Sequence, residues 1–235
     1  KAELALTLTQ TQLQIEQGQY DTALAMLESV YALNPRHPMV LDQLRQVHLA
    51  REDWAALIDL IPVLHKVGKL TPKQEEDLLQ QAWRGRLDAA SGALETLRPI
   101  WQELPRKLRQ DPDLLAAYGD RLRQLGADNE AAELWLDALR KQVSPQLLAR
   151  LPKLKLDSYQ PMLTLLQKIQ DQPGVDAALA QVYLLAGQLD DAQRLLEQEV
   201  ARAPNAAVYH ALGQVMDKRR LTNKANEYYR QALQM

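Results

Sequence analysis

The side chains best suited to ligate a metal or a haem iron are the four histidines, His37, His48, His65 and His210. No pair of them has the HExxH spacing that presents two ligands on one helix face, and the chain contains no cysteine. Zinc motifs built from local sequence and covalent haem attachment through CxxCH are therefore excluded. Non-covalent haem ligation by one histidine or tyrosine remains an alternative to ordinary packing or solvation of these rings.

The carboxylates are plentiful, yet their positions favour a structural role. Asp21, Asp190 and the acidic run 75–77 open predicted helices, where the helix dipole stabilises negative charge. The chain contains no GxSxG, no Walker-type phosphate loop and no nucleophile placed beside a base. The sequence therefore predicts a protein that is not an enzyme.

An 18-residue segment occurs twice in the chain, at Gly18–Pro35 and Gly187–Pro204, and it marks helices that carry some of these residues. We call it the repeated segment. In both copies the glycine permits a tight turn, and the proline ends the helix that follows the turn. Ala23 and Ala192 occupy the same place in the two copies, where a small side chain lets a neighbouring helix approach closely. This pattern is typical of the second half of a tetratricopeptide (TPR) repeat, a helix–turn–helix unit of about 34 residues.

Looser matches extend the repeat over the chain and place Trp54, Trp135 and Tyr229 at packing positions. Leucine, alanine and glutamine are abundant, whereas the β-branched and aromatic residues that favour strands are sparse. We therefore predict a single all-α, right-handed TPR-type helical solenoid (an alpha-alpha superhelix) over residues 1–235, with about ten to twelve helices. Its units are expected at residues 3–35, 38–65, 72–104 (an irregular helix pair), 112–143, 144–173 (an insertion), 174–204 and 206–235.

The irregular helix pair departs from the repeat pattern. Pro62 is expected to interrupt the helix before it, and Thr71 is expected to cap a helix that runs to Trp83 or beyond. A further helix is predicted over Asp88–Leu104. Trp83 and Trp101 lie outside the repeat register, so they either fill a wider gap in the core, which is the favoured interpretation, or face a ligand.

The insertion at residues 144–173 is the second departure. Pro152 and Pro161 permit at most two short helices, with residues 153–156 extended or turned between them. A helix over 161–170 would then turn its leucines inward. The insertion is either a packed spacer or a contact site that makes one face differ from a plain repeat array.

Charge and hydropathy limit the partners. The formal net charge of −2 provides no positive field for nucleic acid. No apolar run approaches the roughly 18 residues of a membrane span. Because the chain begins at Lys1 rather than methionine, we expect a fragment whose amino-terminal targeting region is missing.

The first helices of stacked units line a concave groove, which is where a partner would bind. Leu184 and Leu185 are adjacent on one predicted helix, so they cannot both pack against the same neighbour, and at least one is expected to reach this surface. An exposed leucine among amides and a cation would suit a partner's amphipathic helix or extended peptide. The predicted partner-binding residues are Gln181, Leu184, Leu185, His210, Gln214 and Lys218. The same register places Gln12, Ile15, Glu16, Gln43, Gln46, Leu49, Asp120, Arg123 and Gln124 in the groove of the earlier units.

Several segments are not part of the TPR consensus: LIDLIP at Leu57–Pro62, shortly after Trp54, QQAW at Gln80–Trp83, and LPKLK at Leu151–Lys155. With these segments, nearly the whole chain resembles the TPR region of the HemY family, bacterial inner-membrane proteins associated with the late, membrane-linked steps of haem biosynthesis. The resemblance implies two amino-terminal membrane helices that are not in this sequence and a TPR domain on the cytoplasmic side of the membrane. An unrelated flavoenzyme, a protoporphyrinogen oxidase, shares the name, but this chain has no GxGxxG following a strand.

Two classes of function follow. The first is a scaffold without a cofactor that binds other proteins and holds haem-biosynthesis enzymes near the bacterial inner membrane. The second is a carrier that binds haem or porphyrin in the groove or in the irregular middle of the chain. A general TPR assembly factor unrelated to haem is a more distant third.

Overall fold

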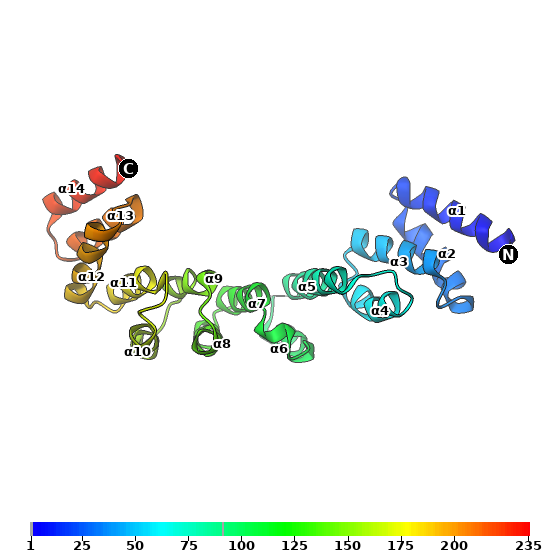
Figure 1. Cartoon of the computed structure of the whole chain (residues 1–235), viewed down its shortest axis with the longest axis horizontal. Helices are drawn as coiled ribbons and strands as arrows, with labels where there is room; N and C mark the ends of the chain where they lie inside the picture. The colour runs from blue at the N-terminus through cyan, green and yellow to red at the C-terminus, as the bar shows by residue number, and fades with distance from the viewer. Residues whose placement is uncertain (1, 91) are drawn as a thin grey trace. The chain divides into compact units, whose positions relative to one another are not determined.

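The computed structural model describes residues 2–90 and 92–235, and within these residues it consists of α-helices and short 3-10 turns without any strand (Figure 1). The chain divides into two compact units, residues 1–109 and residues 110–235. Fourteen α-helices are present in the described residues, somewhat more than the ten to twelve expected. The all-α prediction is confirmed, while a single solenoid over the whole chain stays a prediction.

Unit 1 is a series of helices joined by short turns, and successive helices pack against each other. A 3-10 turn, Leu108–Gln110, lies at its boundary with the second unit. The helices of unit 1 are α1 (Ala2–Glu16), α2 (Tyr20–Leu33), α3 (Pro38–Arg51), α4 (Trp54–Lys66), α5 (Pro72–Asp88) and α6 (Leu94–Glu103).

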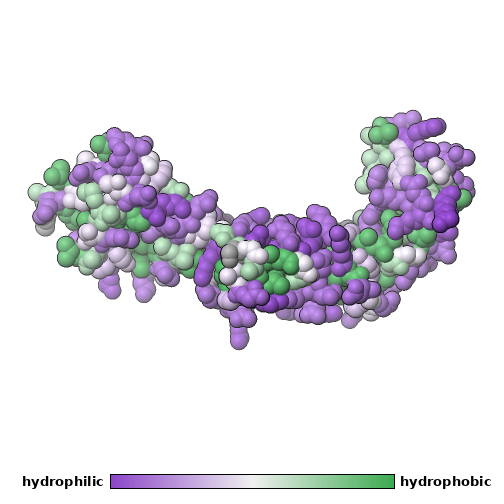
Figure 2. Space-filling view, turned by 180° about the vertical axis from the view of Figure 1, so that it is seen from behind, coloured by the Kyte–Doolittle hydropathy of each residue, from purple (hydrophilic) through white to green (hydrophobic). Residues whose placement is uncertain are grey.

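Unit 2 contains longer helix pairs and, between them, a segment of short elements. Its helices are α7 (Pro112–Gln124), α8 (Asp128–Lys141), α9 (Pro145–Leu148), α10 (Gln160–Lys168), α11 (Val175–Leu185), α12 (Leu189–Arg202), α13 (Ala206–Lys218) and α14 (Thr222–Leu233), with the 3-10 turn Leu151–Lys153 after α9. On the face drawn in Figure 2, hydrophilic residues surround smaller hydrophobic patches in both units, as expected of amphipathic helices packed around a core.

The glycines and alanines of the repeated segment lie where they were predicted. Gly18 and Gly187 adopt positive φ angles of 73° and 75°, which only glycine adopts without strain, and each ends the turn between two helices. Ala23 and Ala192 are fully buried. The repeated segment therefore determines both the turn between the two helices and the close helix packing after the turn.

The start of α5 was also predicted correctly. The Thr71 hydroxyl accepts a hydrogen bond from the backbone N–H of Gln74 at 3.2 Å, and the Gln74 side chain accepts one from the Thr71 N–H at 2.9 Å. This reciprocal capping box, with Pro72 next to it, starts α5. At the start of α7, the Asp111 carboxylate accepts from two backbone N–H groups at 2.9 and 3.0 Å.

The expected interruption at Pro62 is wrong, because α4 continues through this residue to Lys66. A proline inside a helix removes one hydrogen bond, here the one to the carbonyl of Ile58. Ile61 and Leu64 on either side of it are fully buried. Their packing outweighs the lost hydrogen bond and keeps the backbone helical.

The helix predicted over Asp88–Leu104 is too long. Asp88 belongs to the end of α5, and α6 begins only at Leu94. Gly92 lies in the interval between them, and glycine is a weak helix former because it loses the most backbone freedom. Ser91, which the predicted helix contained, lies outside the described residues.

The large aromatic residues belong to the core to different extents. Trp135 is fully buried and Trp83 is 4% exposed, whereas Trp54, Trp101 and Tyr229 are half-buried. The guanidinium of Arg86 lies 5.3 Å above the ring of Trp83, which is the geometry of a cation–π contact. The structure therefore supports the packing interpretation for Trp83.

The insertion matches its prediction closely. It contains α9, a 3-10 turn and α10, so its two α-helices are short, and Lys153 in the 3-10 turn fits the expected extended or turned segment. Leu163 and Leu166 of α10 are buried and Ile169 is half-buried. The insertion is thus packed into unit 2 along one side.

Candidate protein-binding groove

Two hollows flank α11 in unit 2, and Gln181 lies on the wall of both. The first has a volume of about 290 Å³ and the second about 730 Å³. We call the two together the Gln181 groove. The first is lined by Pro145, Leu148, Ala149, Pro152, Gly174, Ala177, Ala178 and Gln181, and the second by Gln181, Ala206, Ala207, His210, Gln214, Tyr229, Ala232 and Leu233.

Local sequence explains why helices present these side chains. Gly174 adopts a φ of 82° at the N-terminus of α11, which lets the chain turn into the helix beside the insertion. Asn205 caps α13 by accepting a hydrogen bond from the Val208 N–H at 3.1 Å. From that start, His210 and Gln214 follow each other at a spacing of four residues and therefore share one face of α13.

Three of the predicted partner-binding residues come together in this groove. Gln181, His210 and Gln214 all line the second hollow. Leu185 is 40% exposed, so one of the two adjacent leucines reaches solvent, while the expectation that it contributes to the partner-binding surface stays a prediction. Leu185 itself does not line the groove.

Of the other two residues, Leu184 needs correction, and Lys218 stays a prediction. Leu184 is 5% exposed and belongs to the core of unit 2, as do Val182 and Tyr183, because α11 is buried around most of its circumference. Leu184 could contact a partner only if the packing of α11 against its neighbouring helices were disrupted. Lys218 is exposed at the end of α13 but is not part of either hollow.

Sequence reasoning missed most of the apolar lining. Ala206 and Ala207 stand four and three residues before His210, so helical spacing could have placed them on the same face. Tyr229 was assigned to the core, and Leu233 was not considered. Leu233 is 88% exposed, and its contribution depends on α14 lying against α13.

His210 and Tyr229 supply the aromatic polar groups of the second hollow, beside the amides of Gln181 and Gln214. Their ring centroids lie 5.3 Å apart at an interplanar angle of 45°, and the Tyr229 hydroxyl donates a hydrogen bond to Asp217 at 2.6 Å. Burial, this hydrogen bond and the negative charge of Asp217 together raise the pKa of Tyr229 to about 12. Tyr229 therefore stays a neutral phenol at physiological pH.

The Gln181 groove is otherwise apolar and uncharged. Among the described residues that line it there is no aspartate, glutamate, lysine or arginine. Its polar side chains are the two amides, the imidazole and the phenol. Such a surface complements an uncharged segment of polypeptide better than a charged ligand.

In unit 1, two residues predicted to face the groove are buried instead. Ile15 is 9% and Gln43 is 3% exposed. The Gln43 amide donates a hydrogen bond to the Leu8 carbonyl at 2.9 Å, and its side-chain oxygen accepts one from Thr11. Gln43 therefore fastens α3 to α1, a role that the repeat register alone did not reveal.

The remaining histidines belong to unit 1. His65 Nδ1 is 2.6 Å from a carboxylate oxygen of Glu75, and His48 Nδ1 is 3.5 Å from one of Asp53. Within residues 2–90 and 92–235, no group of three or more metal-ligating side chains is positioned to hold an ion. No helix in the same residues is long and apolar enough to cross a membrane.

Stacked helix pairs with grooves beside their first helices define a helical-repeat protein. No protein-family model matches the chain. Over 221 residues, 92% of its length, the chain is 25% identical to the protein named "Protein HemY" in Escherichia coli strain K12, and equally to those in Escherichia coli O157:H7 and Shigella flexneri. The resemblance to HemY drawn from the sequence is thereby confirmed. The chain spans 56% of the length of these relatives.

Proposed function

We propose that this chain is a non-catalytic scaffold of the TPR type, with a right-handed superhelix, that binds other proteins through the Gln181 groove. The observation that carries the proposal is the position of Gln181 on the wall of two hollows, one between α11 and the insertion and the other beside α13 and α14. A ligand that spans both hollows would pass directly over this amide.

The lining of the groove favours a polypeptide ligand. Ala177 and Ala178 in the first hollow, and Ala206 and Ala207 in the second, leave room for a backbone to approach the helices closely. The amide of Gln181 can then donate to a carbonyl of the ligand and accept from one of its N–H groups. An extended, uncharged segment or the apolar face of a helix would satisfy both conditions.

The resemblance to HemY gives this scaffold a context. We place it among the proteins associated with haem biosynthesis at the bacterial inner membrane, with the repeat domain on the cytoplasmic side. Membrane attachment would come from helices that precede the matched region in the relatives. The partners would then be enzymes of the late steps of that pathway.

A crosslinking pull-down from membranes with the full-length protein tests the proposal. Gln181→Glu together with Gln214→Glu places two charges in an uncharged groove, so the pathway enzymes should be lost from the captured proteins. Gln231→Glu is the matched control, because Gln231 is exposed on α14 outside the groove. Capture of the same enzymes by the groove variant, with melting unchanged, would remove the groove from consideration.

A haem or porphyrin carrier is the second candidate, and one observation favours it. The exposed ring of His210 stands beside Tyr229 in a hollow of about 730 Å³, where an imidazole could ligate iron. Addition of haemin to the purified protein would then shift the Soret band, and His210→Ala would abolish the shift. Enzyme capture that survives His210→Ala would favour the scaffold.

A further inference from the structure

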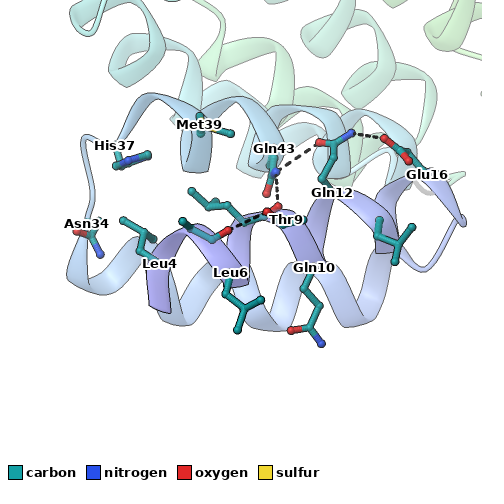
Figure 3. Close-up of a pocket in the computed structure, with 13 residues that line it drawn as sticks. Leu4, Leu6, Thr9, Gln10, Gln12, Glu16, Asn34, His37, Met39 and Gln43 are labelled. Carbon is teal, nitrogen blue, oxygen red and sulfur yellow. Dashed lines mark hydrogen bonds between the residues drawn. The ribbon is translucent and has the colours of Figure 1, made fainter. Parts of the chain in front are cut away.

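Helix α1 presents an uncharged apolar face on the side opposite the core of unit 1. Its buried residues, Leu8, Thr11 and Ile15, point into that core. Leu6 and Leu13 point away from it and are 70% and 53% exposed. Figure 3 shows the Leu6 side chain directed away from α3. We define the outer seam of α1 as the exposed residues Ala2, Leu6, Thr9 and Leu13.

A hollow of about 1250 Å³ borders this seam and continues towards α3 (Figure 3). Leu6, Thr9 and Leu13 belong to its lining. Across the hollow lie His37 and Met39, and Met39 is 54% exposed. The exposed leucines are thus part of a larger apolar surface rather than isolated side chains.

The spacing of the seam matches helix–helix packing. Its members follow each other at intervals of four, three and four residues, the 3.5-residue period at which one helix packs along another. A helix whose outer face meets only water normally carries charged residues there. Between Glu3 and Glu16, α1 has no ionisable side chain at all. The seam is therefore built to be covered by a helix.

The charges beside the seam select the kind of helix. Glu3 stands next to the first residue of the seam, and Glu16 follows Leu13 by three residues and ends the seam with a carboxylate. Glu16 is held by a hydrogen bond from Gln12 at 3.1 Å. Antiparallel pairing of α1 with a second copy of itself would place Glu3 against Glu16, and parallel pairing would place identical carboxylates together. Flanking charges of like sign disfavour a coiled-coil pair.

We infer that the outer seam of α1 docks an amphipathic helix of a partner protein, with apolar residues at four-three spacing and lysine or arginine at the flanking positions. This site lies in unit 1 and does not depend on the Gln181 groove. A protein with both surfaces would bind two partner segments of different chemistry, one basic and helical and the other uncharged.

The test uses a fluorescent helical peptide of about three heptads, with leucine along one seam and lysine at the flanks, kept below the concentration at which it self-associates. Fluorescence anisotropy measures its binding to the 235-residue chain. The lysine peptide should bind at least about tenfold more tightly than the same peptide with glutamate flanks. Leu6→Gln with Leu13→Gln should weaken its binding by at least about tenfold. Leu33→Gln is the matched control, since Leu33 is 83% exposed on α2 and lies outside the hollow.

Reversing the charge at Glu16 distinguishes the docking of a basic helix from nonspecific hydrophobic binding. Glu16→Lys should weaken binding of the lysine peptide about threefold and strengthen binding of the glutamate peptide. Absence of binding by either peptide, or equal binding of both, would overturn the proposal. So would a dimer in light scattering that Leu6→Gln with Leu13→Gln dissociates, because the seam would then be covered by a second copy of the chain.

Discussion

The indole of Trp135 on α8 lies directly against Gly119 on α7, where a Cβ atom would overlap the ring. The indole Nε1–H donates a hydrogen bond to the Leu115 carbonyl at 2.8 Å, which fixes the ring in this position. The same arrangement joins Tyr229 to Gly213 in unit 2. An aromatic side chain seated on a helical glycine is therefore a recurring way to bring two helices together in this fold.

Gly119→Ala should destabilise the protein by about 1–3 kcal/mol, because the added methyl forces the buried indole to move. In an unobstructed helix the same change would stabilise the protein by about 0.5–1 kcal/mol, so the sign of the effect is informative. Urea denaturation measures it. Gly92→Ala, in the interval between α5 and α6, controls for the added methyl alone, since nothing lies within 4 Å of its Cβ position. A Gly119→Ala protein as stable as the parent would contradict the packing described.

Ala192→Phe should destabilise unit 2 by about 1–3 kcal/mol or more, since Ala192 is fully buried and a phenyl ring would overpack the helix contact. Ala201→Phe on the same helix is the control, because Ala201 is exposed. Thermal melting of both variants provides the comparison. Equal melting temperatures for Ala192→Phe and the parent would show that the repeat register is misassigned.

Leu184→Ala and Leu185→Ala should differ although the residues are adjacent. Leu184 is buried, so its truncation should cost about 2–5 kcal/mol of unfolding free energy. Leu185 is 40% exposed, and its truncation should cost less than about 1 kcal/mol. Chemical denaturation of the two variants under one set of conditions decides the matter. A reversed order would mean that α11 is rotated about its axis.

Pro62→Ala should stabilise unit 1 by about 1–3 kcal/mol. Alanine restores the backbone hydrogen bond to Ile58 and removes the clash of the proline ring inside α4. Because Pro62 is exposed, the change leaves no cavity. A rise in melting temperature is the expected measurement. An unchanged or lower value would indicate that the proline is accommodated without strain.

Tyr229 should make the stability of the protein depend on alkaline pH. Burial and the hydrogen bond to Asp217 raise its pKa to about 12 in the folded state, against about 10 for a free tyrosine. The neutral form is thus favoured by folding, so this contribution is fully present below about pH 10 and is lost as the pH rises towards 12. Denaturation midpoints across that range should fall less steeply in Tyr229→Phe. Parallel pH profiles for the two proteins would contradict the shifted pKa.

The sequence by itself determined the features that depend on neighbours along the chain. Thr71 was predicted correctly as the residue that caps α5, and the turns at Gly18 and Gly187 were predicted correctly as well. Backbone hydrogen bonding in turns and caps involves residues only a few positions apart, so their identities suffice. The burial of Ala23 and Ala192 followed for the same reason, because the repeat fixes their distance from the turn glycine.

The tertiary structure decided what depends on contacts between helices. Helix α4 continues through Pro62 because Ile61 and Leu64 pack into the core. Leu184, not Leu185, faces inward because the neighbouring helices fix the rotation of α11. Both residues are leucine, so residue type alone does not tell which of the two is buried. Gln43 is polar, yet it is buried, since Leu8 and Thr11 satisfy its amide from another helix. Such outcomes depend on which partner lies across the interface, and the order of residues in one helix does not specify that partner.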